Sequence, residues 1–265
     1  MVSAVSRRRS WLILAATVVG AATTLVAAAP ADPTTAPKPR AGGAVVVAIH
    51  LDPPSLNYYL DLGAPFSTSV ISDQVLASAY RDVGRSGAFV PDLIDGDPKI
   101  TRRPFSLTYT IKKDARWSDG VAITARDFVY TWQVLAKSSF KIPDATRAAY
   151  GNIVHANVLG AKRVRFVFRH VDVEWKQLFA PVLPRHALAG ANFDEVWRER
   201  IDNPKTGRPI ASGPFIFAGR NRGSSLTLAR NRNYWGRKAR LDRLSFRVIL
   251  DYSEELRALL EETST

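Results

Sequence analysis

Residues 115–128 read ARWSDGVAITARDF, which places a tight turn directly before a capped helix. The turn at residues 117–120 (WSDG) ends in glycine, the residue that most readily adopts the positive backbone angle of such turns. Thr124 is followed three residues later by Asp127, which is the pattern of a capping box. We therefore expect a helix over residues 124–136.

Several stretches around this turn are typical of β-strands. Residues 105–111 (FSLTYTI) alternate along the chain, which predicts a half-buried strand. Residues 44–49 (AVVVAI) are almost continuously apolar and β-branched, which predicts a strand buried on both faces. By the same criteria we expect strands at residues 153–159, 163–169, 214–218, 226–230 and 244–250, with a hairpin formed by 214–218 and 226–230.

Helical spacing is found between these strands. Residues 67–80 carry apolar side chains at helical intervals, and Asn192 with Glu195 predicts a capped helix at 193–200. A further helix is expected at 252–262, whereas residues 138–150 are expected to form an irregular loop. Because strands and helices alternate, the fold class is α/β or α+β and not a pure β-sandwich.

The N-terminal segment has the features of an export signal. Three arginines at residues 7–9 precede an uncharged apolar run at 11–29, and residues 29–31 (APA) form a small-x-small cleavage site. A cleaved signal and a retained anchor both stay open, as do the general and twin-arginine export routes. The predicted organisation is a signal peptide at 1–31, a Pro/Ala/Thr linker at 32–41 and a folded part at 42–265.

Residue composition excludes several kinds of chemistry. The chain has no cysteine, so it has no disulfide, thiolate metal site, cysteine nucleophile or lipid-modified cysteine. No hydrolase, zinc-protease or phosphate-loop motif is present, and we expect neither an enzyme nor a cofactor. No metal site is expected either, because the four histidines lack ligand spacing: His50, His155, His170 and His186.

The chain is basic, with a formal net charge of +13. Removing the predicted signal peptide, with its three arginines, would lower this charge to +10. A basic protein of the cell envelope that binds nucleic acid or another polyanion is therefore an alternative function. However, the basic residues are dispersed along the chain, so we do not expect a nucleic-acid partner, and polyanion binding remains the alternative.

Four motifs, in this order, resemble the extracytoplasmic solute-binding proteins of ABC importers that handle oligopeptides, dipeptides and nickel. Residues 115–128 are the most specific, although Ala122 stands where the family usually has proline, and Tyr58 is a similar departure. The resemblance extends from about Gly42 to the end of the chain. The other motifs are residues 52–57 (DPPSLN), 91–93 (PDL) with 108–113 (TYTIKK), and 211–215 (ASGPF) with 228–236 (LARNRNYWG).

The resemblance implies a non-enzymatic, clamp-like fold: the first lobe of a type II periplasmic binding protein with the additional small domain of the peptide-binding family. Such proteins take a peptide backbone along exposed strand edges. The candidate ligand-binding residues are Tyr58, Tyr59, Leu60, Tyr150, Ser212 and Gly213. The implied partners are an oligopeptide or another small solute (nickel and sugar stay open) and the permease subunits of an ABC transporter, with the binding protein a monomer.

Length is the main departure from this family. The resemblance implies a second lobe beyond the equivalent of residues 259–260, whereas this chain ends at Thr265. We therefore expect a truncated or incomplete form, located in the periplasm or at the outer face of the cytoplasmic membrane. One lobe alone is expected to bind ligand weakly, and a nanomolar affinity would contradict the incomplete-clamp view.

Overall fold

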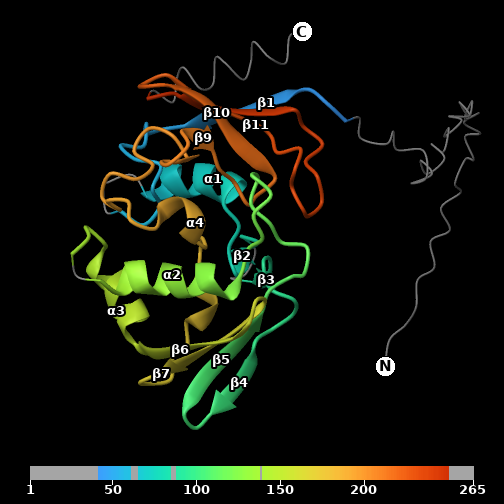
Figure 1. Ribbon diagram of the computed structural model, residues 1–265. Helices are drawn as coiled ribbons and strands as arrows, with labels where there is room; N and C mark the ends of the chain where they lie inside the picture. Colours follow the sequence, from blue (N-terminus) through green and yellow to red (C-terminus); the bar gives the residue numbers. More distant parts are fainter. Residues whose placement is uncertain (1–40, 61–64, 85–87, 138, 251–265) are drawn as a thin grey trace, which may run out of the picture. The chain divides into compact units, whose positions relative to one another are not determined.

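The computed structural model describes residues 41–60, 65–84, 88–137 and 139–250 (Figure 1). The predicted signal peptide, most of the linker and the helix expected at 252–262 lie outside these residues. The described part contains two four-stranded sheets, each with a helix against it.

The first sheet has the strand order β1-β12-β11-β10. β1 pairs in parallel with β12, and the other neighbours are antiparallel. The helix α1 (Pro65–Val75) lies against this sheet, next to β10 (Figure 1). The strands are β1 (Ala44–Ile49), β10 (Phe215–Asn221), β11 (Ser225–Arg230) and β12 (Arg243–Val248).

The second sheet is entirely antiparallel, with the order β4-β5-β7-β6. The amphipathic helix α2 (Ala125–Ala136) covers one of its faces (Figure 1). Phe166, Phe128 and Phe179 meet between the sheet and the helix, with ring centroids 4.8 Å (Phe166–Phe179) and 5.1 Å (Phe128–Phe179) apart. The strands are β4 (Lys99–Arg102), β5 (Phe105–Thr110), β6 (Ile153–Gly160) and β7 (Arg163–Phe168).

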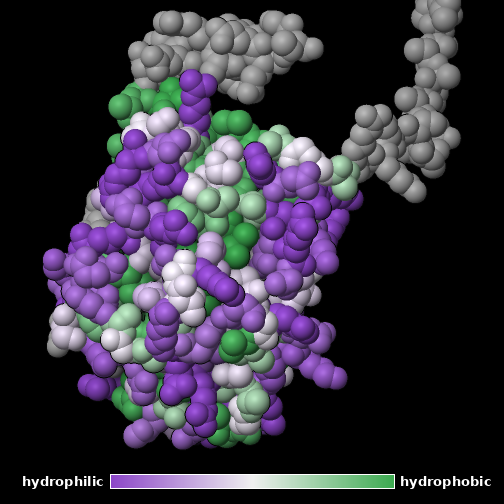
Figure 2. Space-filling model, turned by 45° about the horizontal axis from the view of Figure 1, so that its top comes forward, coloured by the Kyte–Doolittle hydropathy of each residue, from purple (hydrophilic) through white to green (hydrophobic). Residues whose placement is uncertain are grey.

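Shorter elements connect the two sheets. A two-stranded ribbon and the helix α3 matter most for the site below. These elements are β2 (Tyr80–Asp82), β3 (Phe89–Pro91), α3 (Asp144–Gly151), a 3-10 turn at Trp175–Gln177, α4 (Arg185–Leu188), β8 (Asp202–Asn203) and β9 (Arg208–Pro209). In Figure 2 the visible face is largely hydrophilic, with hydrophobic side chains in smaller patches.

The capped helix predicted from residues 115–128 is confirmed. Asp127 Oδ2 accepts a hydrogen bond from the Thr124 N–H at 2.7 Å and lies 3.1 Å from Thr124 Oγ1. Asp127 Oδ1 accepts a further hydrogen bond, from the Arg185 N–H at 3.0 Å. The same carboxylate therefore caps α2 and holds the start of α4 against it.

The turn before this helix is also confirmed. The Gly120 N–H donates to the Trp117 carbonyl at 3.0 Å, and Gly120 has a φ of 90°. The strands predicted at 105–111, 153–159, 163–169, 214–218, 226–230 and 244–250 all form, with ends shifted by a few residues.

The prediction that residues 44–49 are buried on both faces is wrong. β1 is an edge strand with β12 on one side, and Val45 and Val46 are 41% and 52% exposed. The apolar run reflects β-propensity, but burial requires a covering layer, and only the end of β1 is covered, where Ile49 is 3% exposed.

Two predicted boundaries between helix and loop are wrong. Residues 138–150, expected to be a loop, contain α3, because Pro143 immediately precedes the helix and leaves its interior unbroken. Residues 193–200, expected to be a helix, form successive turns in which Trp197 has a φ of 60°. The Trp197 carbonyl accepts from the Leu56 N–H, and its ring N–H donates to the Asp202 carbonyl, so distant partners replace helical hydrogen bonds.

The helix predicted at 67–80 ends earlier than expected. α1 stops at Val75, after which the N–H of Ala77 donates to Ser212 Oγ at 2.8 Å. The N–H of Ala79 donates to the Phe179 carbonyl at 2.8 Å. Backbone groups that would continue the helix are therefore bonded to segments far away in the sequence.

Candidate functional site

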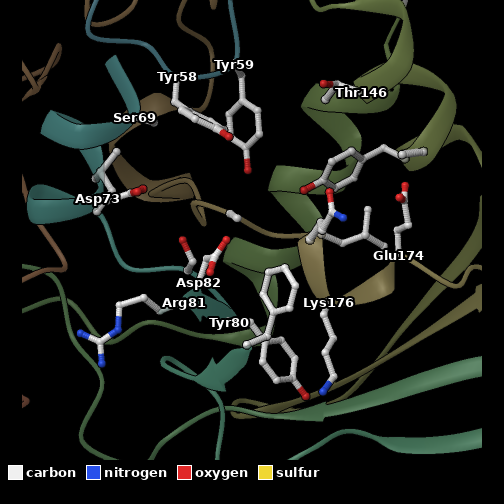
Figure 3. Close-up of a pocket in the computed structure, with 18 of the residues that line it drawn as sticks. Tyr58, Tyr59, Ser69, Asp73, Tyr80, Arg81, Asp82, Thr146, Glu174 and Lys176 are labelled. Carbon is white, nitrogen blue, oxygen red and sulfur yellow. The ribbon is translucent and has the colours of Figure 1, made fainter. Parts of the chain in front are cut away.

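A cavity of about 820 Å³ lies beside α1, β2 and α3 (Figure 3). This volume suits a small organic ligand or a short peptide segment. Its walls come from five parts of the chain. They contain Tyr58, Tyr59, Phe66, Ser69, Asp73, Leu76, Ser78, Tyr80, Arg81, Asp82, Phe89, Asp92, Pro143, Ala145, Thr146, Ala149, Tyr150, Asp172, Glu174, Lys176, Gln177, Leu178 and Ala180.

One face of α1 forms a wall of the cavity. Phe66, Ser69 and Asp73 follow at intervals of three and four residues, so their side chains emerge on the same side of the helix. The opposite side carries Ile71 and Val75, which are fully buried in the core. Burial of that apolar side thus orients the polar side toward the cavity.

Tyr59, which precedes α1, and Tyr150 of α3 are both hydrogen-bonded to residues 179–181. The Tyr59 hydroxyl donates to the Pro181 carbonyl at 2.5 Å, and the Tyr150 hydroxyl accepts from the Phe179 N–H at 2.6 Å. Both side chains are at least 95% buried. Burial raises the pKa of both phenols, first because it disfavours the phenolate, so they remain neutral hydrogen-bonding groups.

Tyr58 is the more open tyrosine, at 39% exposure. Its ring meets that of Tyr59 edge to face, with centroids 5.5 Å apart. In Figure 3 both tyrosine rings hang over the same open space, opposite Asp82. Tyr58 therefore has a ring available to a ligand, whereas the hydroxyl groups of Tyr59 and Tyr150 are engaged in the protein.

Asp73 is the most perturbed carboxyl group of the cavity. Loss of hydration within the cavity walls raises its pKa to about 6, and the negative charges of Asp82 and Asp92 contribute further. The pKa of Asp92 is also raised by burial, which the nearby charge of Arg81 partly offsets. Burial is therefore the main cause of both pKa shifts, and neighbouring carboxylates add to that of Asp73.

The structure brings three of the six predicted ligand-binding residues together at the cavity, namely Tyr58, Tyr59 and Tyr150. Leu60 adjoins them in sequence but is buried and does not line it. The N–H groups of Tyr59 and Leu60 both donate to Asn57, so residues 58–60 form a turn and offer no free strand edge there.

Ser212 and Gly213 lie elsewhere, buried against the end of α1. Both N–H groups donate to the Val75 carbonyl, at 3.0 and 2.8 Å. A Cβ at Gly213 would stand 2.7 Å from the Gln74 carbonyl oxygen, so glycine is required by this close approach. In this structure the two residues support the fold of the cavity wall and do not line it.

The acidic residues of the cavity were missed at the level of sequence: Asp73, Asp82, Asp92, Asp172 and Glu174. One local signal was available, because Ser69 and Asp73 interrupt the apolar spacing of the predicted helix on a single face. The remaining carboxylates come from a ribbon and a loop, whose meeting point depends on the tertiary fold.

Within the described ranges, no three His, Cys, Asp or Glu side chains converge to hold a metal ion. Over the same ranges, no helix has both the length and the apolar character needed to cross a membrane.

Solved structures with this fold are solute-binding proteins. The periplasmic EDTA-binding protein EppA is similar with a TM-score of 0.75 and 25% identity, over 85% of this chain and 43% of that one. The oligopeptide-binding protein AppA from Bacillus subtilis, solved in complex with a nonapeptide, has a TM-score of 0.71 and 22% identity. That alignment covers 86% of this chain and 44% of AppA.

The family model of bacterial extracellular solute-binding proteins, family 5, matches residues 88–263, and the chain belongs to this family. The expected resemblance and the mixed α/β fold of this family's binding proteins are thus confirmed. Members of the family are extracellular solute-binding proteins by description.

Curated relatives are considerably longer than this chain. LpqW of Mycobacterium tuberculosis, a probable monoacyl phosphatidylinositol tetramannoside-binding protein, is 26% identical over 77% of the chain and 32% of its own length. The oligopeptide-binding protein OppA of Mycobacterium bovis is 31% identical over 62% of the chain and 28% of its own length. The chain thus spans about a third or less of these relatives.

Proposed function

We propose that this chain forms one wall of the ligand cleft in the substrate-binding component of an ABC importer, and that its ligand is a peptide or another small solute. The observation that carries this proposal is the cavity of about 820 Å³ in a chain of the family 5 solute-binding proteins. A relative named as oligopeptide-binding and a similar fold solved with a nonapeptide support a peptide first. Similar folds also bind EDTA and nickel–histidine.

The mechanism requires binding and closure and no covalent step. Tyr58 offers a ring to the ligand, while the hydroxyl groups of Tyr59 and Tyr150 fix their side chains to the backbone of residues 179–181. Closure of a second lobe over the ligand would exclude water and strengthen these contacts. We propose further that the protein is exported with residues 1–31 as its signal and 32–41 as a linker, acts as a monomer and delivers ligand to membrane permease subunits.

Affinity should be low for this chain by itself. The solved relatives extend over more than twice the length that the chain matches. Contacts from one wall leave the ligand largely hydrated, so we expect a Kd of about 1 mM, equivalent to about 4 kcal/mol of binding free energy.

The test is an NMR titration of the ¹⁵N-labelled chain with a library of three- to five-residue peptides of all charges. Shifts are expected for residues around the cavity, including Tyr58 and Ser69. Tyr58→Ala should reduce the shifts severalfold because it removes the open ring. Tyr130→Ala on α2, a half-buried tyrosine outside the cavity, is the matched control and should leave them unchanged.

The proposal would be contradicted if the shifts were confined to residues outside the cavity. It would also be contradicted if no shifts appeared at about 10 mM peptide, which is well above the expected Kd. A nanomolar Kd for this chain alone would contradict the single-wall interpretation.

A further inference from the structure

The charge of the cavity is opposite to that of the whole chain. The sequence has 37 Lys and Arg against 24 Asp and Glu, yet the cavity is lined by more acidic than basic residues. The acidic ones are Asp73, Asp82, Asp92, Asp172 and Glu174, and the basic ones are Arg81 and Lys176. If the cavity had the composition of the whole chain, basic residues would outnumber acidic ones there.

The two basic residues of the cavity form no close ion pair with its carboxylates, although the charge of Arg81 partly offsets the raised pKa of Asp92. Among the described residues, none of the five acidic groups forms an ion pair within 4 Å. Lys176 Nζ instead lies 5.4 Å from the centre of the Tyr80 ring and 5.5 Å from that of Trp175. In Figure 3, the side chains of Arg81 and Lys176 extend toward the bottom of the view, away from the open space beneath Tyr58 and Tyr59.

The segment after β7 also directs acidic side chains toward the cavity. Residues 171–174 alternate valine with Asp or Glu, and the carboxylates of Asp172 and Glu174 line the cavity. Val171 and Val173 are consequently 66% and 87% exposed. Asp172 is half-buried and Glu174 is exposed, so both carboxylates keep contact with water while the segment leaves its valines uncovered.

Aromatic rings complete a cation-binding environment. Tyr58, Phe66 and Phe89 line the cavity, and the faces of such rings attract an ammonium or guanidinium group. Burial is the main cause of the raised pKa of Asp73, and the neighbouring carboxylates of Asp82 and Asp92 raise it further. A cavity of this size with aromatic walls suits an organic cation better than a bare metal ion.

We propose that the ligand carries an organic cationic group, an ammonium or a guanidinium, which Asp73 and Asp82 hold against the ring of Tyr58. This inference rests on the proposed function, because it takes the cavity as the ligand site. It adds the charge class of the ligand, which neither the family nor the fold specifies.

The test uses three pentapeptides with blocked termini, identical except for two positions that are lysine, norleucine or glutamate. Binding to the chain is followed by NMR shifts at pH 7.5 and low salt. The lysine peptide should bind about tenfold more tightly than the norleucine peptide, and the glutamate peptide more weakly still.

The double variant Asp73→Asn/Asp82→Asn should remove most of this preference. Asp114→Asn/Asp144→Asn, the same charge change at exposed positions outside the cavity, is the matched control and should retain it. Lowering the pH through about 6 should weaken lysine-peptide binding as Asp73 takes up a proton, with Asp82, Asp92 and Tyr58 as the groups that face it.

Two outcomes would overturn the inference, and they differ in what they say about the proposed function. If all three peptides shift the cavity residues equally, in the chain and in the double variant, the cavity binds solutes without selecting charge. If none of the peptides shifts the cavity residues, both the charge class and the proposed function of the cavity fail together.

Discussion

Asp73 shows how a single residue can serve a binding site at the expense of stability. Its carboxyl group has a pKa of about 6, above its ordinary value of 3.8, because the cavity walls reduce its hydration and Asp82 and Asp92 add negative charge. The folded protein therefore holds the proton more tightly than the unfolded chain does. Ionisation of Asp73 then disfavours the folded state between about pH 4 and pH 6, and the loss persists above pH 6.

Asp73→Asn should accordingly stabilise the chain at neutral pH. We expect the free energy of unfolding to rise by about 1 kcal/mol at pH 7.5 and to be unchanged below about pH 4. The increase is small because the Asp73 side chain is open to solvent. Urea unfolding at several pH values measures this difference. Asp114→Asn, the same change at an exposed position, is the control and should stay within about 0.5 kcal/mol. Equal stability of Asp73→Asn and the parent chain at pH 7.5 would contradict this view of the cavity.

At the scale of elements, hydrogen bonds decide where helices begin and end. The capping box of α2 was predictable because both partners lie within four residues of each other. The turns at 193–200 were not, because their hydrogen bonds go to Leu56 and Asp202. Local patterns therefore predict an element only where its polar backbone groups find local partners.

The capping carboxylate of α2 should contribute strongly to stability. Asp127 is 4% exposed and accepts hydrogen bonds from Thr124 and Arg185, so Asp127→Ala removes the acceptor of two part-buried N–H groups. We expect a loss of about 3 kcal/mol in the free energy of unfolding. Chemical denaturation monitored by tryptophan fluorescence gives this value.

Asp144→Ala provides the matched control for this prediction. Asp144 also stands in the first turn of a helix, but its side chain is 97% exposed and, among the described residues, forms an ion pair with Arg147. Its loss should cost about 0.5 kcal/mol. Similar costs for the two variants would show that Asp127 acts only as a local charge at the helix end and does not join α2 to α4.

For the whole molecule, the uneven distribution of charge bears on the alternative function. The strands β4, β5, β6 and β7 contain no Asp or Glu, and their sheet exposes Lys99 and Arg163 away from α2. This face is basic while the cavity is acidic. A polyanion would therefore meet this sheet and not the cavity.

We expect polyanion binding to be weak at physiological salt, because the basic residues are dispersed. Fluorescence anisotropy with a labelled DNA duplex should give a Kd weaker than about 10 µM at 150 mM salt, with a shallow salt dependence. Lys99→Gln/Arg163→Gln reports whether any residual binding uses this sheet. A submicromolar complex that weakens steeply with salt would favour the polyanion-binding alternative over solute binding.

Much of the architecture followed from the sequence. The alternating strands, the glycine turn at 117–120 and the capped helix after it were all predicted, as was the family. These features depend on side-chain periodicity and on hydrogen bonds between near neighbours. The sequence did not predict the start of α3 at Asp144, because a proline suits a loop as well as the residue before a helix.

Three properties were decided only by the tertiary structure. The exposure of β1 depends on which strands and layers lie beside it, and the end of α1 depends on acceptors from Ser212 and Phe179. The acidic cavity depends on segments separated by as many as about 100 residues, from Asp73 to Glu174. The physical reason is common to all three: periodicity and capping act over one or two turns of chain, whereas burial and electrostatic potential sum over everything that folding brings nearby.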